Sequence, residues 1–304
     1  MAPQVAHPRA GMSDRWFSIL LIAPAMIVIL SFALFPLVYA MDVSFRFADL
    51  TRGRIGEYVG LDNYRAVFAD QAFWDASWIT LKFTIVAVCA EMVLGIAIAF
   101  LLHGATHGKG LIRSLIILPL ATSAAVTGLF WRYLYDTQFG VLNWLLGSLG
   151  IYEPNWLGDF NIALWSVVIF DIWQWTPFVA LIALAGLQSL PKEPFEAAEL
   201  DGASTWMVLR TLTFPLLAPV LFLVFVLRTI DCVRLYDAIA VLTRGGPGTA
   251  TETVTFYLFR TGLKFFRMDY ASTMSVFFLY VMLVAAVFAL TPLLKQFTSR
   301  AAEG

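Results

Sequence analysis

Two apolar segments of the chain contain side chains that could hold a small polar ligand. Asp171, Gln174 and Trp175 lie at i, i+3 and i+4, which places them on one face of a helix. Arg228, Asp231 and Leu235 have the spacing i, i+3 and i+7 and also share a face. Carboxylates and an amide hydrogen-bond hydroxyl groups, while an aromatic ring stacks on C–H faces. Because charge inside an apolar segment is costly, the two trios predict a polar path between helices that binds a polyhydroxylated solute.

A purely structural role for the same residues is the alternative. Arg228 and Asp231 could pair within one helix, and Asp171 could lie at a water interface. Glu91, in another apolar segment, has no obvious partner and is interpreted as a residue that holds helices together. Trp173 is one position off the proposed face, so we expect it to pack against lipid or a neighbouring helix.

The composition indicates a membrane protein. The chain is 60% hydrophobic and 13% charged, whereas soluble domains have about 25% charged residues. A net charge of −1 gives no indication of nucleic-acid binding. Cys89 and Cys232 lie in apolar surroundings and are interpreted as small buried hydrophobes. The three histidines form no cluster with acids or cysteines, so no metal site is expected.

Six apolar segments are long enough to cross a membrane, for which a helix needs about 20 largely apolar residues. They are Trp16–Met41, Thr80–His103, Leu111–Tyr135, Ile162–Leu187, Leu216–Arg234 and Ser272–Leu294. The first is too long, and followed by too much apolar sequence, to be a cleaved signal peptide. The expected fold class is an all-α membrane protein with six transmembrane helices.

Charged residues between the segments indicate which ends face the cytosol. Basic residues are divided evenly between the two sides, but those on the predicted outer side lie in long loops together with acids. The short loop that holds Lys109 is basic only, whereas the loop after Arg132 carries Asp136, Glu153 and Asp159. Both features predict that the N- and C-termini are cytoplasmic.

The polar break between the fourth and fifth segments has the sequence of a compact helix and a turn. Pro194 suits the first helical turn, and Glu196 near the start favours the helix dipole. Gly202 is predicted to end this helix in the left-handed conformation. Ser204 is predicted to cap a second helix that runs as far as Pro215.

The same break is a candidate docking site for another protein. Ala197 and Ala198 leave a smooth face that a second backbone can approach closely. The candidate docking residues are Glu196, Ala197, Ala198, Asp201, Gly202 and Ala203. A helix-turn-helix linker without a partner fits the local physics equally well.

Residues 191–204, with Phe214-Pro215 downstream, resemble the "EAA" loop of permease subunits in bacterial ABC importers. That loop is the family's contact with the ATP-hydrolysing subunits. Further segments resemble carbohydrate-type permeases, namely Val59–Tyr64 with Phe73-Trp74, Trp131 with Phe139–Asn143, Asp171–Phe178, Ala185–Pro191, Arg234–Asp237 and Val241–Pro247. Together they cover most of residues 16–297, and the maltose-, trehalose- and glycerol-phosphate-type permeases are the relatives suggested.

The resemblance implies a type I ABC importer permease fold. Residues 1–15 would be a cytoplasmic tail, residues 16–297 the six-helix domain with its coupling loop at 191–214, and residues 298–304 a second cytoplasmic tail. The chain has Arg244 where the family often has a third glycine before Gly-Pro, and we expect no change in the outer loop's role. The extra spans and large outer domain of the maltose-type long subunit are missing, so the minimal six-helix form is expected.

The resemblance also implies partners. These are a second homologous permease, two ATP-binding subunits, an extracytoplasmic solute-binding protein and membrane lipid, with no nucleic acid. ATP and Mg would be bound by the partner ATPase subunits, and no cofactor or metal is expected in this chain. The chain would sit in the bacterial inner membrane and import a sugar, polyol or related solute past the two trios of polar residues. The sequence does not name the solute.

Two other classes of function are alternatives. An ion-coupled secondary transporter of a small polar solute would need ion relays and internal repeats, and no such repeat is seen in the sequence. A membrane enzyme would need a catalytic set, but Gly-x-Ser-x-Gly and His-Glu-x-x-His are absent. The nearest text to a phosphate-binding loop, Gly104 to Gly110, has the wrong spacing and no hydroxyl, so no ATPase is expected in this chain.

Overall fold

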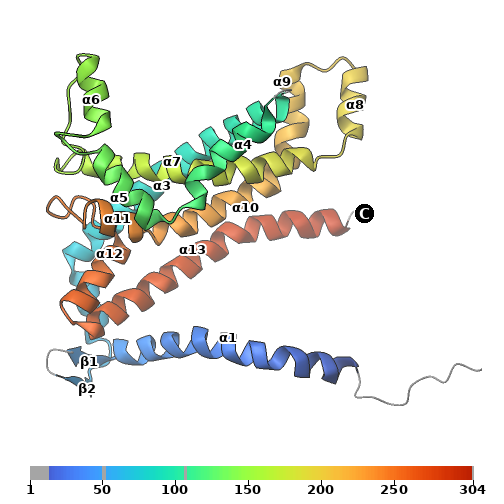
Figure 1. Ribbon diagram of the computed structural model, residues 1–304. Coiled ribbons are helices and arrows are strands. Elements are labelled where there is room, and N and C mark those ends of the chain that lie inside the picture. Colours follow the sequence, from blue (N-terminus) through green and yellow to red (C-terminus); the bar gives the residue numbers. More distant parts are fainter. Residues whose placement is uncertain (1–13, 50–52, 106–107, 303–304) are drawn as a thin grey trace, which may run out of the picture. The chain divides into compact units, whose positions relative to one another are not determined.

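The computed structural model of the chain describes residues 14–49, 53–105 and 108–302 (Figure 1). Helices dominate, and the only sheet in those residues is one antiparallel pair of short strands. The chain divides into two compact units, residues 1–69 with 260–304 and residues 70–259, each described by itself. Most of the expected N-terminal tail, residues 1–15, lies outside the described residues.

The first unit joins the two ends of the sequence. It consists of α1 (Asp14–Ser44), β1 (Arg46–Asp49), β2 (Arg54–Tyr58), α2 (Asp62–Ala69), the π turn η4 (Arg260–Lys264) and α13 (Met268–Ala302). The carbonyl oxygen of Ser44 accepts from the Asn63 amide at 3.0 Å and from the Thr273 hydroxyl at 3.1 Å. The end of α1 is therefore bonded to both α2 and α13. The sequence did not indicate the β1–β2 hairpin.

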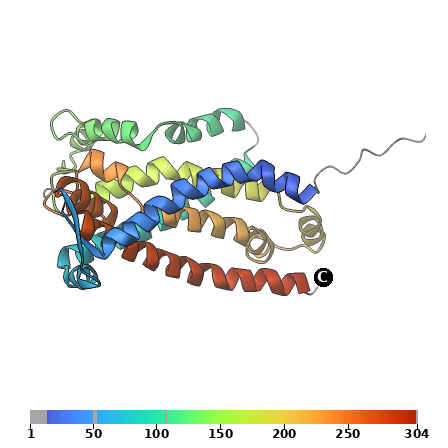
Figure 2. The same ribbon diagram turned by 90° about the horizontal axis from the view of Figure 1, so that it is seen from below.

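The second unit contains the remaining helices. They are α3 (Gln71–Gly104), α4 (Lys109–Ile117), η2 (Leu118–Ala121), α5 (Ala124–Leu134), α6 (Val141–Ser148), α7 (Ala163–Gln188), α8 (Glu193–Leu200), α9 (Thr205–Val208), η3 (Leu209–Thr213), α10 (Phe214–Val233), α11 (Asp237–Leu242) and α12 (Val254–Phe259). Helices α3, α7 and α10 pack on one another, with α8 and α9 at one end of the unit and α6 at the other (Figures 1 and 2).

Small residues let α3 and α7 approach closely. A Cβ added at Gly95 of α3 would lie 2.6 Å from the Cβ of Val179 and 3.0 Å from the backbone nitrogen of Ala180, both in α7. Near this contact a buried apolar cluster joins α3, α7 and α10 through Ala99, Leu102, Ala183, Leu184, Leu187 and Leu217. Close approach at a glycine is a common way for membrane helices to associate without a hydrophobic driving force.

Replacing Gly95 with alanine is expected to destabilise the protein by about 1–3 kcal/mol, because the added methyl group overpacks the contact with α7. Thermal unfolding of the purified protein in detergent measures this loss. Gly104→Ala is the matched control, since it lies in the same helix and a Cβ there meets nothing within 4 Å. An equal loss in both variants would contradict the packing argument.

Within the part of the chain that the structure describes, five helical stretches are long and apolar enough to cross a membrane, and a bent pair counted as one span makes a sixth. Four of the predicted segments correspond to α1, α3, α7 and α13, and the fifth matches α10 to within two residues at each end. The backbone of α13 continues as far as Ala302, so the helix includes most of the expected C-terminal tail, residues 298–304.

The third predicted segment, Leu111–Tyr135, is not one straight helix. Its halves, Gly110–Ala121 and Ala124–Leu134, meet at an angle of 98°. Thr122 has an extended backbone, and the Ser123 side chain accepts a hydrogen bond from the Val126 amide, which starts a new helix. Since Pro119 disturbs the ladder just before this point, the break follows from breaker and capping residues that the hydropathy pattern does not register.

The helix that begins after Ser204 was predicted to end at Pro215, and that prediction was wrong. Helices α9, η3 and α10 follow one another without a gap from Thr205 to Val233. The Phe214 amide donates to the Leu209 carbonyl five residues back, so the helix widens to a π turn directly before the proline. Such a turn re-forms the bonding pattern around a residue that lacks an N–H, and the chain stays helical.

The link between α5 and α6 depends on side chains that cap backbone groups. A carboxylate oxygen of Asp136 accepts from the amides of Phe139 and Gln138, each at 2.9 Å, and these bonds lower the pKa of Asp136. Asn143 accepts from the indole N–H of Trp156 at 2.7 Å. These contacts fix the start and the end of the Phe139–Asn143 segment.

Candidate functional site

The polar loop between α7 and α9 folds as predicted. Helix α8 has Pro194 in its first turn and ends at a Gly202 whose φ is +70°. The Gly202 amide donates to Glu199 at 3.1 Å, and the Ala203 amide donates to Ala198 at 2.9 Å. These two bonds form a Schellman motif, the usual way in which a left-handed glycine satisfies the last carbonyls of a helix.

Helix α9 begins at the next capping residue. The Ser204 hydroxyl accepts from the Met207 amide at 3.3 Å. The loop is therefore a capped helix-turn-helix. We call residues 191–214 the coupling loop, after the loop of the family that their sequence resembles.

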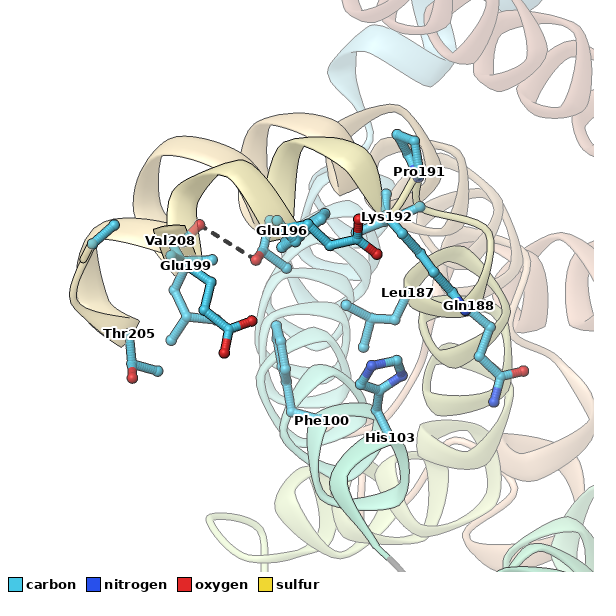
Figure 3. A pocket seen from close by; sticks show the side chains of 15 residues that line it. Phe100, His103, Leu187, Gln188, Pro191, Lys192, Glu196, Glu199, Thr205 and Val208 are labelled. Carbon is cyan, nitrogen blue, oxygen red and sulfur yellow. Dashed lines mark hydrogen bonds between the residues drawn. The ribbon is translucent and has the colours of Figure 1, made fainter. Parts of the chain in front are cut away.

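The candidate docking residues line two different hollows of the coupling loop. A cavity of about 730 Å³ lies against the ends of α3 and α7, with Glu196, Glu199 and His103 around it (Figure 3). On a separate side, Pro194, Ala197, Ala198, Asp201, Gly202, Ser204 and Met207 help to line a hollow of about 640 Å³. Ala203 lines both. The smooth alanine face and Glu196 thus belong to different surfaces of the loop.

Three exposed apolar side chains on the coupling loop were missed by the sequence analysis. Leu200 is 91% exposed, Trp206 is 70% exposed and Met207 is 54% exposed. They lie on either side of the Gly202 turn. Aromatic and methionine residues are enriched in protein interfaces, so the types of these residues were the available signal.

The second site is an ion cluster buried between α3, α7 and α10. The Arg228 guanidinium donates from Nε and Nη2 to both carboxylate oxygens of Glu91, at 2.7 and 2.9 Å. Its Nη2 also donates to Asp171 Oδ2 at 2.9 Å. All three side chains are at most 2% exposed. Each helix contributes one member, so the cluster connects all three helices.

This geometry tests three interpretations from the sequence. Glu91 has a partner, Arg228, and the bonds between them join α3 to α10, as expected of a residue that holds helices together. Asp171 is buried rather than placed at a water interface. The pair of Arg228 with Asp231, which the alternative interpretation proposed, is present as a longer contact, since Nη1 lies 3.7 Å from an Asp231 carboxylate that is 49% exposed. Arg228 bonds Glu91 and Asp171 more closely than Asp231 because a buried carboxylate needs a cation, whereas an exposed one is solvated by water.

Five of the six predicted solute-path residues line one cavity. It has a volume of about 210 Å³ and is lined by Ala124, Phe170, Asp171, Trp175, Arg228, Asp231, Arg234, Leu235, Tyr236, Asp237 and Ala238. We call this hollow the ion-cluster cavity. The Trp175 ring lies with its centre 4.6 Å from Arg228 Cζ, in a cation–π contact.

Gln174 is the predicted solute-path residue that does not line the ion-cluster cavity. It is 2% exposed, and its Oε1 has no hydrogen-bond partner among the described residues. Trp173 is 41% exposed and packs beside Trp131, as its position off the predicted face suggested.

The ion cluster also contains a group of potential metal ligands, Glu91, Asp171 and Cys232, whose ligand atoms lie within 4.8 Å of one another. The Arg228 guanidinium already bonds both carboxylates and the Cys232 sulfur, the last at 3.2 Å. A fixed positive charge at this position opposes a metal cation. Of the two cysteines interpreted as buried hydrophobes, Cys232 is buried and Cys89 is exposed.

Comparison with known proteins places these features in a family. Residues 91–302 match the family described as binding-protein-dependent transport system inner membrane component. The chain is 40% identical over 275 residues to a probable ABC transporter permease protein, y4oQ, of Sinorhizobium fredii, covering 90% of this chain and 87% of that protein. It is 38% identical over 240 residues to the trehalose/maltose transport system permease protein MalF of Thermococcus litoralis, covering 79% and 81%.

A solved structure has the same fold. It is a bacterial alginate ABC transporter in complex with an alginate pentasaccharide-bound periplasmic protein, with a TM-score of 0.79 and 22% identity over 90% of this chain and 92% of that one. The family match and the helical spans define a membrane component of a binding-protein-dependent transport system. The chain belongs to the binding-protein-dependent ABC transporter permeases, the inner membrane components of these systems.

Proposed function

We propose that this chain is one of two permease subunits of an ABC importer that takes a sugar or polyol into the cell. The observation that carries the proposal is the coupling loop, a Schellman-capped helix-turn-helix with exposed apolar residues, in a chain of the permease family. The trehalose/maltose assignment of a relative at 38% identity supports the carbohydrate class.

In this proposal the coupling loop docks onto an ATP-hydrolysing subunit. Leu200, Trp206 and Met207 would be covered by that subunit, because large exposed apolar side chains around a rigid turn form an efficient contact. The hollow beside Ala197 and Ala198 would admit a partner's backbone or side chain. ATP and Mg would be bound by the ATPase subunits, and the loop would face the cytosol together with both termini.

The ion-cluster cavity is proposed as part of the solute path. Asp231 and Asp237 provide exposed acceptors for hydroxyl groups, and Trp175 provides an aromatic face. A second permease subunit would complete the cavity, and an extracytoplasmic binding protein would deliver the solute.

Reconstitution into lipid vesicles tests this function. The chain, purified with a second permease and two ATPase copies, is expected to take up radiolabelled solute only when ATP and the solute-loaded binding protein are both present. Uptake by this chain alone, driven by a proton or sodium gradient without ATP, would overturn the proposal in favour of a secondary transporter.

A further inference from the structure

Negative charge exceeds positive charge around the ion-cluster cavity. Three carboxylates line it, those of Asp171, Asp231 and Asp237, and a fourth, that of Glu91, is bonded to the lining Arg228. Two guanidinium groups, of Arg228 and Arg234, oppose these four acids. The cavity and its immediate support therefore have a formal excess of two negative charges.

Arg228 would be the natural anion-binding group of this cavity, but its donors are already used. Nε and Nη2 are bonded to Glu91 and Asp171, which leaves Nη1 at the cavity side, 3.7 Å from Asp231. An anionic solute would have to compete with three carboxylates for Arg228, which leaves Arg234 as the other guanidinium on the lining. It would also lie close to like charges, which repel it.

Glu91 accepts more hydrogen bonds from Arg228 than either Asp171 or Cys232 does. It accepts two of the guanidinium bonds in a bidentate geometry, the strongest form of this pairing, and it is 0% exposed. Glu91 is not among the lining residues of the cavity. It acts on a solute without touching it, by pairing with Arg228 and through the field of its own charge.

We propose that Glu91 is a specificity-determining residue that makes the ion-cluster cavity reject anions. The solutes accepted are uncharged or cationic polyhydroxylated molecules, and sugar phosphates, uronates and sulfonated sugars are disfavoured. This inference rests on the proposed function, since it matters only if the cavity lies on the solute path.

Thiol-reactive probes of opposite charge measure the potential in the cavity without knowledge of the solute. Leu235→Cys and, in a second variant, Ala124→Cys each place a neutral reporter at a lining position. The probes are the cationic 2-(trimethylammonio)ethyl and the anionic 2-sulfonatoethyl methanethiosulfonates. The reaction rate of each probe with the assembled transporter is divided by its rate with a small free thiol. The rate measured on the transporter without the introduced cysteine is subtracted first, to correct for reaction at Cys89 and Cys232.

After this correction, the cationic probe is expected to react at least about tenfold faster than the anionic probe. This is the effect of two excess negative charges on probes of unit charge at an effective dielectric constant of about 20.

Glu91→Gln keeps the size and one acceptor of the side chain but removes its charge. This variant is expected to lower the ratio by about threefold or more, and Glu91→Asp, which keeps the charge, to preserve it. Glu252→Gln is the matched control, because Glu252 is also a buried glutamate and does not line the cavity.

Equal rates for the two probes in the wild-type background would overturn the inference, and so would a ratio that Glu91→Gln leaves unchanged. Neither result would affect the proposed function, which the reconstituted uptake assay tests separately. If both reporters resist both probes and also the neutral methyl methanethiosulfonate, the cavity is closed to solutes. That outcome would remove the cavity from the solute path and this inference with it.

Discussion

Replacing Arg228 with methionine is expected to destabilise the chain by about 3–5 kcal/mol, which is enough to prevent assembly of a stable transporter. Methionine retains an apolar stem but donates no hydrogen bond, so Glu91 and Asp171 would remain as buried carboxylates without a cation. The measurement is the melting temperature and the yield of the purified complex. Arg228→Lys is expected to lose less, because it keeps the charge but not the bidentate geometry.

Neutralising the correct partners should restore the stability that Arg228→Met loses. The triple variant Arg228→Met, Glu91→Gln, Asp171→Asn removes the stranded charges, and we expect most of the wild-type stability to return. The double variant Arg228→Met, Asp231→Asn is expected to stay unstable, since Asp231 is half exposed and only a distant partner. Recovery in the double variant and not in the triple would show that the cluster has been assigned incorrectly.

Replacing Gly202 with valine is expected to lower ATP-driven uptake about tenfold, while the chain still inserts into the membrane. The left-handed conformation costs a residue with a Cβ about 1–2 kcal/mol, and this strain opposes the Schellman turn that orients α8. A Cβ at Gly202 meets nothing within 4 Å, so the effect comes from the backbone and not from a clash. Uptake and co-purification of the ATPase subunits measure the loss.

Gly150 provides a closely matched control for Gly202. It also has a φ of +70°, it also has no atom within 4 Å of an added Cβ, and the bonds from Gly150 to Gly147 and from Ile151 to Leu146 form the same motif at the end of α6. Gly150→Val therefore has the same backbone strain outside the coupling loop, and uptake is expected to stay near the wild-type level. Equal losses in the two valine variants would argue against a docking role for the loop.

Local signals explain why much of the fold could be predicted. The length of the apolar segments locates five helices, and a proline, a glycine and a serine in order fix both ends of α8 and the start of α9. These features depend on neighbouring residues only, so a single sequence contains them. The break at Thr122 was missed because a count of apolar residues does not distinguish a straight helix from two halves at 98°.

The ion cluster shows what a single sequence leaves undetermined. Glu91 and Arg228 are separated by 137 positions, and nothing in either local pattern indicates that they meet. Local spacing favoured Asp231 as the partner, three residues from Arg228 on the same helix. Burial decided the pairing instead, because two carboxylates enclosed by α3 and α7 need a cation more than an exposed one does. The cost of an unpaired Glu91 was the available signal.

The continuous helical segment from Thr205 to Val233 has the second helix of the coupling loop at one end and Arg228 near the other. Arg228 lies 23 residues beyond Thr205, or roughly 35 Å along an α-helix. A tilt of about 5° at the base of this segment would displace its far part by roughly 3 Å, which is comparable to the length of the hydrogen bonds from Arg228 to Glu91 and Asp171. The guanidinium therefore either stays bonded and turns α3 and α7 with α10, or breaks away and uncovers two carboxylates inside the protein. Since the second path is far more costly, we expect α10 to move together with α3 and α7.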